Sequence, residues 1–384
     1  MPWKETTPVD QRMHFVAALS TCRWTMSELC RLYGISRKTG YKWATRYGRQ
    51  GVDGLKDRSR RPASCPHQTD ERCEAALVEE REKHPTWGAR KLLARLGRRH
   101  PDWPWPAAST ATAVLKRHGL VTPRKLRRRR PAPGKPTVEA VQPNDVWTAD
   151  FKGEFRTGDR RMCFPLTVAD HHSRFLLACS GRRSTARTRA MPVFEEAFRT
   201  YGLPRVILTD GGTPFAASRS PRHLSRLSVW WIKLDIEPLL IEPGHPEQNG
   251  RHERMHRTLK AETARPPAAS LEAQQAAFDG FRHEYNHQRP HEALGQIAPA
   301  ELYARSPRPY AGRVPQVSYP GHFEVRRVKA KGGILFQGNE LFVSGALARE
   351  WVGLEEVDDG LWSVWFGSFL LGRYDERDAT FEAL

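Results

Sequence analysis

The chain has 384 residues, of which 39% are hydrophobic, and a formal net charge of +19 at pH 7. A chain of this length is expected to form about two to four domains. The sequence shows no transmembrane segment and no apolar core of a signal peptide in MPWKETTPVDQR. Its six cysteines include no CxxC pair. This cysteine pattern excludes an evident zinc module and predicts reduced thiols in a cytoplasmic protein.

The positive charge is concentrated in the first third of the chain. Residues 1–135 contain 30 Lys and Arg against 12 Asp and Glu, a balance of +18, whereas residues 136–384 contain 32 and 31, a balance of +1. A concentrated positive block is the electrostatic pattern of a nucleic-acid-binding surface. The alternative is a basic arm without a fold, but the helical periodicity and turn signals of this block favour folded domains.

A first domain is predicted over residues 1–62, with three short helices between residues 10 and 48. Ser27 and Ser36 are the expected N-caps of the second and third helices, and Gly34 supplies the turn between them. Two helices joined by a tight turn, the second rich in Lys and Arg, fit a helix-turn-helix. Gly40 lies inside the third helix, where glycine costs about 1 kcal/mol relative to Ala. The expected DNA contacts of this domain and its Arg-rich connector are Arg37, Lys38, Lys42, Arg46, Arg58, Arg60 and Arg61.

A second helical domain is predicted over residues 63–121, followed by a basic linker over residues 122–142. The domain resembles another helix-turn-helix that would present Lys116 and Arg117 to DNA, although a plain three-helix bundle explains the pattern equally well. Pro and Gly oppose regular structure in the linker. Its run Arg127, Arg128, Arg129 and Arg130 would follow a phosphate backbone, or the linker is simply a solvated spacer.

From Asp145 the composition changes to alternating strand-like and helical runs. Strands are predicted near residues 145–155, 161–173, 174–184, 205–212 and 237–243, and helices over residues 185–202, 220–234 and 248–262. This order predicts a mixed sheet with helices on its faces. A further helix and polar loop follow over residues 270–295. Six short strands with recurring turn signals between residues 322 and 374 predict a small β-barrel within a domain of residues 318–384.

Three acids occupy informative positions in the central region. Asp150 lies on the first strand in VWTADFKG, Asp210 ends a strand in VILTDGG, and Glu253 begins the helix GRHERMHRTLK. Carboxylates at strand ends gather at one edge of an α/β sheet, and an all-oxygen site suits Mg²⁺ or Mn²⁺ rather than Zn²⁺. Any one of these acids alone would more often cap a turn or a helix, so the prediction depends on the ordered set.

Divalent metals would relieve the repulsion among three neighbouring carboxylates. Two ions about 3.5–4 Å apart would hold the attacking and leaving oxygens of a phosphodiester displacement. Water could then attack to cleave a strand, and a DNA 3′-hydroxyl could attack to join one.

The motifs WTADFKG, ILTDGGTPF and HPEQNGRHERMHRTLK resemble the Asp-Asp-Glu triad of the DDE integrase/transposase superfamily. The similarity is greatest to insertion-sequence transposases with a retroviral-integrase-like, ribonuclease-H-fold core, here expected over residues 143–304. The tail YNHQRPHEALG followed by PAELY, residues 285–303, resembles the segment after that core. Between Asp210 and Glu253 lie 42 residues, more than in many members, and we expect the additional residues within 218–234.

The resemblance implies that Asp150, Asp210 and Glu253 bind two Mg²⁺ or Mn²⁺ ions. It also implies recognition of terminal inverted repeats, cleavage at transposon ends and transfer of 3′ ends into target DNA by a homodimer or higher oligomer, in a nucleoid-associated bacterial protein. Residues Glu253, Arg257 and Lys260 share one helical face, so the two cations would hold DNA beside the metal; an ion pair between Glu253 and Arg257 uses the same spacing. Further DNA contacts are expected from Gln248, Asn249 and Arg254.

Two other functions fit parts of the sequence. One is a helix-turn-helix regulator without catalysis, which would have no use for three acids near phosphate. The other is a metal-dependent nuclease without strand transfer, which would share the same metal site, so the sequence does not distinguish it from a transposase.

Overall fold

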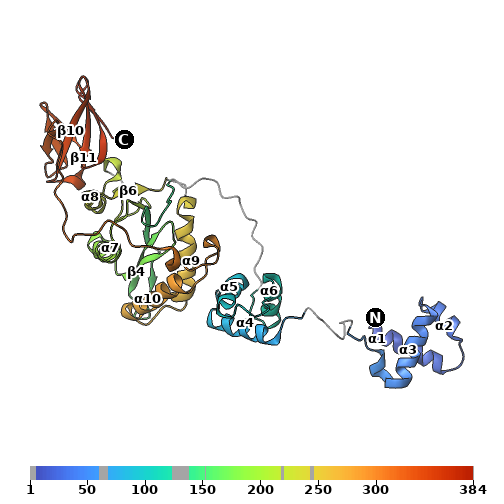
Figure 1. Ribbon diagram of the computed structural model, residues 1–384. Coiled ribbons are helices and arrows are strands. Elements are labelled where there is room, and N and C mark those ends of the chain that lie inside the picture. The colour runs from blue at the N-terminus through green and yellow to red at the C-terminus, as the bar shows by residue number, and fades with distance from the viewer. Residues whose placement is uncertain are drawn as a thin grey trace. The chain divides into compact units, whose positions relative to one another are not determined.

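The computed structural model describes residues 6–59, 68–122, 138–151, 153–217, 220–242 and 246–383. The chain divides into two compact units, residues 1–68 and 69–384, coloured along the chain in Figure 1. Among the described residues, no helix has the length and apolarity that a membrane crossing requires. Six of the predicted DNA-contacting arginines lie outside the described residues: Arg60, Arg61, Arg127, Arg128, Arg129 and Arg130.

The first unit contains the three predicted helices. It consists of α1 (Pro8–Ser20), α2 (Met26–Leu32), α3 (Arg37–Gln50) and the short 3-10 helix η1 (Gly51–Leu55). Gly34 has a φ of +62° between α2 and α3, and the Ser36 hydroxyl accepts from Thr39 N–H at 3.2 Å, as expected. The predicted cap of α2 was wrong. Thr25 caps this helix, because its hydroxyl and the Glu28 carboxylate form a reciprocal capping box.

Gly40 is required by packing in this unit. A Cβ atom there would lie 2.6 Å from Cys30 Sγ, 2.8 Å from Met26 Sδ and 3.1 Å from the Phe15 ring. The absent side chain lets α3 approach α1 and α2 closely, so its helix-propensity cost is offset by the packing of the helices.

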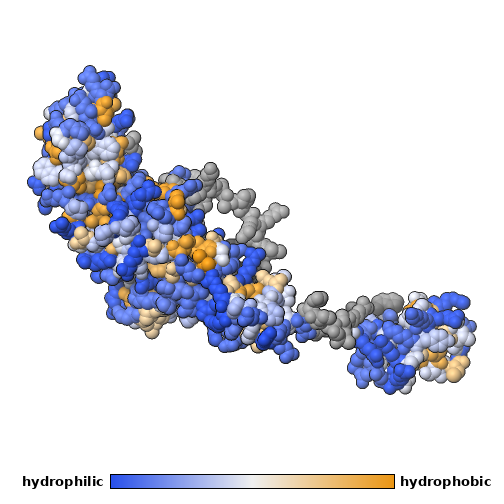
Figure 2. Space-filling view, viewed as in Figure 1, coloured by the Kyte–Doolittle hydropathy of each residue, from blue (hydrophilic) through white to orange (hydrophobic). Residues whose placement is uncertain are grey.

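The second unit begins with a three-helix domain, which we call the second helical domain. It contains α4 (Glu71–Lys83), α5 (Ala89–Arg99) and α6 (Ala108–Arg117), as the periodicity predicts. Its core is apolar and includes the fully buried Leu77, Trp87 and Leu92. Polar residues dominate the visible surface of both units in the hydropathy view (Figure 2).

The central region, residues 143–304, has the predicted mixed α/β architecture. It contains, in chain order, β1 (Val146–Phe151), β2 (Phe155–Arg156), β3 (Met162–Asp170), β4 (Leu176–Arg182), α7 (Arg187–Tyr201), β5 (Val206–Thr209), α8 (Arg226–Lys233), β6 (Glu237–Leu240), η3 (Pro246–Asn249), α9 (Gly250–Thr263), α10 (Leu271–His287), η4 (Glu292–Leu294) and α11 (Pro299–Leu302). The sheet runs β4-β3-β1-β5-β6, and β2 also pairs with β3. β1 pairs antiparallel with β3 and parallel with β5, so the sheet is mixed.

Helices cover both faces of this sheet (Figure 1). On one face, α7 and α8 contribute Phe194, Phe198 and Trp231 to a core around Trp147 of β1. On the other face, α9 and α10 pack through a second cluster that includes Phe278. The sheet therefore holds α9 directly against the strands that carry the acidic residues.

The edge strand β4 is covered by side chains of α10. Asn286 accepts from Leu176 N–H at 2.7 Å and donates to the Leu176 carbonyl at 2.9 Å. Arg282 donates to the Leu177 carbonyl at 2.9 Å, and Gln275 donates to the Cys179 carbonyl at 3.0 Å. These residues satisfy backbone groups that an edge strand would otherwise leave unpaired.

The C-terminal region is β-rich, but its form differs from the predicted barrel. It contains β7 (Glu324–Arg327), β8 (Gly333–Phe336), β9 (Asn339–Phe342), η5 (Gly345–Leu347), β10 (Trp351–Asp358), β11 (Leu361–Phe366), β12 (Phe369–Asp375) and β13 (Thr380–Ala383). Five strands form a sheet in the order β13-β12-β11-β10-β7, and β8 and β9 form a separate hairpin. Within residues 318–383 no pairing between β13 and β7 closes the sheet. The pattern of short strands and turns does not specify closure.

Residues 220–234 form a platform on which this β-rich region packs. Leu224, which follows the 3-10 helix η2 (Pro221–His223), joins Val229 and Ile232 of α8 in the hydrophobic core of the C-terminal sheet. Lys233 also pairs with Glu350 at 3.0 Å. The expectation that the additional residues of the Asp210–Glu253 spacing lie within residues 218–234 stays a prediction.

Candidate active site

The three predicted acids lie on neighbouring elements of the core. Asp150 is on β1, and the parallel register pairs Ala149 of β1 with Thr209 of β5. Asp210 follows Thr209 directly, so it leaves the adjacent strand at the level of Asp150. Glu253 is in the first turn of α9, which packs on the same sheet.

Two of the acids share one cleft with several cations. The cleft has a volume of about 470 Å³ and is lined by Asp150, Phe151, Glu253, His256, Arg257, Lys260, Ala261 and Arg265. The predicted helical face is therefore confirmed: Glu253, Arg257 and Lys260 open onto the same space. Carboxylates beside cations can bind a divalent metal and a phosphate together.

Asp210 is not part of the lining of this cleft. Its carboxylate accepts a hydrogen bond from Gly212 N–H at 3.2 Å, within its own loop. In the part of the chain that the structure describes, no three His, Cys, Asp or Glu side chains are grouped closely enough to hold a metal ion. The donor chemistry of Asp150 and Glu253 fits Mg²⁺ or Mn²⁺, and a three-carboxylate site would need Asp210 as a third ligand.

A buried polar network fixes α9 against the strands. The Thr148 hydroxyl lies 2.8 Å from His252 Nδ1, and the Thr167 hydroxyl lies 2.6 Å from both His252 Nε2 and His256 Nε2. His256 Nδ1 in turn lies 3.5 Å from the Asp150 carboxylate. Because these residues flank Glu253 on the inner side of α9, they set the position of the helix relative to Asp150.

Burial keeps the innermost imidazole of the network uncharged. Desolvation, with a smaller effect from His171, lowers the pKa of His252 to about 3. The pKa of His171 is likewise lowered to about 4, by desolvation and then by Arg251. Both rings are neutral at pH 7, so neither adds positive charge to the inner wall, and His252 contributes its hydrogen bonds to Thr148 and Thr167.

The predicted DNA contacts of the first unit are placed on an accessible helix. Arg37, Lys38 and Lys42 are exposed on α3. Lys42 and Arg46 lie over the Trp43 ring, with 4.4 Å and 5.1 Å to its centroid. Arg58 donates to Gln50 at 2.9 Å, beyond the end of the helix. This arrangement leaves a basic helical face available to a polyanion.

The other predicted contacts have varied surroundings. Lys116 is exposed, whereas Arg117 pairs with Glu74 at 3.0 Å. Gln248 accepts from Glu242 N–H at 2.9 Å, and Asn249 is buried at the start of α9. Arg254 is exposed but does not line the cleft. The DNA contacts assigned to these residues stay predictions.

The sequence interpretation missed two residues of the cleft, His256 and Arg265. His256 could have been found from its spacing, because it lies three residues after Glu253 and so one turn along the same helix. Arg265 follows the end of α9, and no local pattern indicates that the chain returns to the cleft there.

Five models of known families match the chain. Two integrase core domain models match residues 140–246 and 234–299. A helix-turn-helix domain model matches residues 11–63, and a homeodomain-like domain model matches residues 39–115. The C-terminal domain of IS481 family transposases matches residues 323–382. Residues 140–299 thus match an integrase core domain, and the matches together support a DDE integrase/transposase.

The relatives of this chain include proteins of mobile elements. It is 28% identical over 255 residues to a 39.2 kDa protein of insertion element IS476 from Xanthomonas euvesicatoria, covering 65% of this chain and 70% of that protein. It is 29% identical over 165 residues to a 31.7 kDa protein of insertion element IS407 from Burkholderia multivorans, covering 42% and 56%. It is also 29% identical over 123 residues to the Pol polyprotein of Radiation murine leukemia virus, covering 32% and 20%.

The solved structures that resemble this chain include retroviral integrases. The HTLV-2 integrase catalytic core, determined in complex with magnesium, covers 43% of this chain and 100% of its own, at 15% identity and a TM-score of 0.34. The simian T-cell lymphotropic virus intasome, in complex with PP2A regulatory subunit B56 gamma, covers 77% and 97%, at 16% identity and a TM-score of 0.38.

Proposed function

We propose that this protein is a DNA transposase that binds the terminal inverted repeats of a mobile element, cleaves there and joins the 3′ ends to target DNA. The observation that carries the proposal is the cleft in which Asp150 and Glu253 face Arg257 and Lys260 within an integrase core. The insertion-element relatives support this role in a bacterial cytoplasm. Regulation without catalysis would not need paired acids beside phosphate-binding cations.

Asp150, Asp210 and Glu253 would hold two Mg²⁺ or Mn²⁺ ions, which is the metal chemistry expected of this superfamily. Bound ions would stabilise the attacking and leaving oxygens of a phosphodiester displacement. Arg257, Lys260 and Arg265 would hold the DNA backbone by charge-assisted hydrogen bonds.

The residues beneath the cleft would keep the acids in place. His256 would hold the Asp150 carboxylate, and Thr167 and Thr148 would fix the two histidines of α9. Because the network is buried and lies on the sheet, it limits rotation of the helix when a charged backbone binds.

Binding of DNA would involve the first unit as well as the cleft of the core. The exposed cations of α3 would hold the element's end, with recognition of bases in the major groove through the helix-turn-helix. Joining two ends requires two active sites, so we propose at least a dimer on DNA.

A joining assay with purified full-length protein tests this function. Labelled DNA with candidate element ends, Mg²⁺ and a target plasmid should give joined products, and Glu253→Gln should bind the ends normally but form none. Cleaved ends without joined products would favour a nuclease. Binding without cleavage in Mg²⁺ or Mn²⁺ would favour a regulator.

A further inference from the structure

The second helical domain contacts the core through the basic face of α5. Arg98 pairs with Glu301 at 2.7 Å and donates to the Gln296 carbonyl at 3.3 Å. Arg90 pairs with Glu292 at 2.5 Å. These cations were counted among the charges of a DNA-binding block, yet they face acids and carbonyls of the core.

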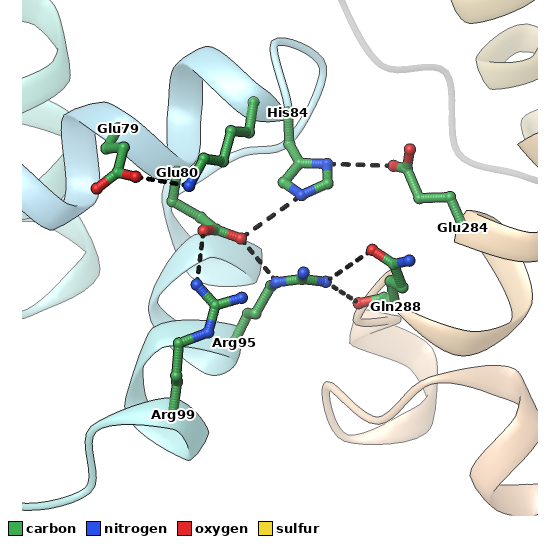
Figure 3. A network of polar contacts seen from close by, with 8 residues as sticks. Glu79, Glu80, His84, Arg95, Arg99, Glu284 and Gln288 are labelled. Atoms are coloured by element: carbon green, nitrogen blue, oxygen red, sulfur yellow. Dashed lines mark hydrogen bonds and ion pairs between the residues drawn. The ribbon is translucent and has the colours of Figure 1, made fainter. Parts of the chain in front are cut away.

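A network of polar contacts around the buried Glu80 also links the second helical domain to α10 (Figure 3). Glu80 is 2% exposed and lies 2.7 Å from Arg95 and 3.2 Å from Arg99. Arg95 also lies 3.3 Å from the Gln288 side-chain oxygen, and His84 lies 3.3 Å from Glu284. The second helical domain and α10 are thus linked by two polar contacts, Arg95 with Gln288 and His84 with Glu284.

One residue of the tail motif YNHQRPHEALG lies where three elements meet. Arg289 is 5% exposed, and its guanidinium donates to Glu262 of α9 at 2.8 Å and to Thr86 of the second helical domain at 3.4 Å. Thr86 and Glu262 also bond directly. The guanidinium lies 5.8 Å from the centroid of the buried Trp87 ring.

Glu262 and Glu253 belong to the same helix. They are nine residues apart, which corresponds to about 13 Å along an α-helix. A helix transmits a displacement of one end to the other because its backbone is continuously hydrogen-bonded. Holding Glu262 therefore restrains the helix that presents Glu253.

We propose that Arg289 is a positioning residue through which docking of the second helical domain on the core fixes the C-terminal turn of α9. The effect on catalysis rests on the function proposed above, whereas the effect on α9 does not. The planar fork of Arg289 spans an acceptor on each element at once, which a lysine ammonium at this position does not reproduce.

Hydrogen exchange of full-length protein without DNA tests the docking step. Arg98→Glu disrupts a pair outside α9, so increased exchange at residues 259–263 would reveal coupling. We expect the exchange rate there to rise about fivefold, the change that corresponds to losing one favourable surface ion pair. The rate should return to the wild-type value in the double variant Arg98→Glu with Glu301→Arg. Lys83→Glu is the matched control, because Lys83 pairs with Glu79 within α4 and, among the described residues, makes no ion pair with the core.

Unchanged exchange at residues 259–263 in Arg98→Glu would overturn the proposal. If that charge reversal prevents folding, Thr86→Val provides the second variant, since it removes the hydroxyl shared by Arg289 and Glu262 and keeps the side-chain shape. It should raise exchange in the same turn, and exchange equal to the wild type would again overturn the proposal.

The role of Arg289 in catalysis is tested by Arg289→Lys in the joining assay. We expect the rate of joining at saturating DNA to fall about tenfold while the Kd for element ends stays within about twofold. An equal loss of joining rate and of affinity for element ends, or no change in either, would contradict a positioning role. Absence of joining by the wild-type protein would instead refute the proposed function and leave the exchange results valid.

Discussion

His256 connects α9 to Asp150, and its removal tests whether that contact matters. His256→Ala should lower the joining rate about 10- to 100-fold, the range found for residues that orient metal ligands. DNA binding should be unchanged, because His256 is 2% exposed. The control is His283→Ala, an exposed histidine on α10. Equal joining rates for His256→Ala and the wild type would contradict the role assigned to this residue.

Lys91 gives the docked domain a distinct pH dependence. Desolvation, followed by the charge of Arg289, lowers its pKa from 10.5 to about 8, despite the opposing effects of Glu262 and Glu292. Between about pH 8 and pH 10.5 the unfolded chain binds more protons than the folded chain. In this range Lys91 therefore makes the unfolding free energy rise with pH.

Replacing Lys91 should therefore remove the free-energy cost of burying its positive charge, which is present at neutral pH. Lys91→Met is expected to be more stable than the wild type below pH 8, by about 1–3 kcal/mol, and this advantage should shrink as the pH rises toward 10.5. Denaturant unfolding at a series of pH values measures the difference. A difference that does not vary with pH would count against the assigned pKa.

At the scale of a helix, Gly40 decides how closely α3 packs. Gly40→Ala should destabilise the first unit by about 1–3 kcal/mol, as overpacking does in a filled core. Gly48→Ala in the same helix is the matched control, because a Cβ there meets nothing within 4 Å; it should be neutral or stabilising by up to about 1 kcal/mol. Circular dichroism during thermal unfolding would compare them, and equal Tm values for both variants would refute the packing argument.

Gly40 also shows where sequence patterns stop being informative. Apolar periodicity correctly predicted α1, α2 and α3, because it records which face of each helix is buried. It cannot show how closely two helices approach, so a packing glycine looked like a defect. The cations of α5 are a similar case, since their partners Glu292 and Glu301 are about 200 residues away in sequence.

For the whole molecule, the basic first unit predicts salt-sensitive DNA binding. The affinity for duplex element ends should fall about 10³-fold or more between 50 and 200 mM salt, as expected for about six or more phosphate contacts. Replacing Lys38 and Lys42 together by alanine should reduce the slope of log K against log salt by about two. A nearly flat salt dependence of the wild-type affinity would contradict this account.

The candidate site was predictable in outline because Asp150 and Asp210 lie near the ends of two strands and Glu253 lies in the first turn of a later helix. The β1–β5 register explains why Asp150 and Asp210 leave the sheet side by side. The orientation of the Asp210 carboxylate was not predictable, since it depends on a hydrogen bond within the loop that follows the strand. The His252–Thr167 network was also hidden, because polar residues on a basic helix give no sign of burial.

The central claim is that Asp150, Asp210 and Glu253 form one metal site. Mn²⁺ binding to full-length protein with a bound element end, followed by electron paramagnetic resonance, tests it most directly in wild type and Asp210→Asn. The account predicts that the wild type binds about two ions per active site and that Asp210→Asn weakens binding by at least about tenfold. Equal Mn²⁺ affinity and stoichiometry in the two proteins would contradict it.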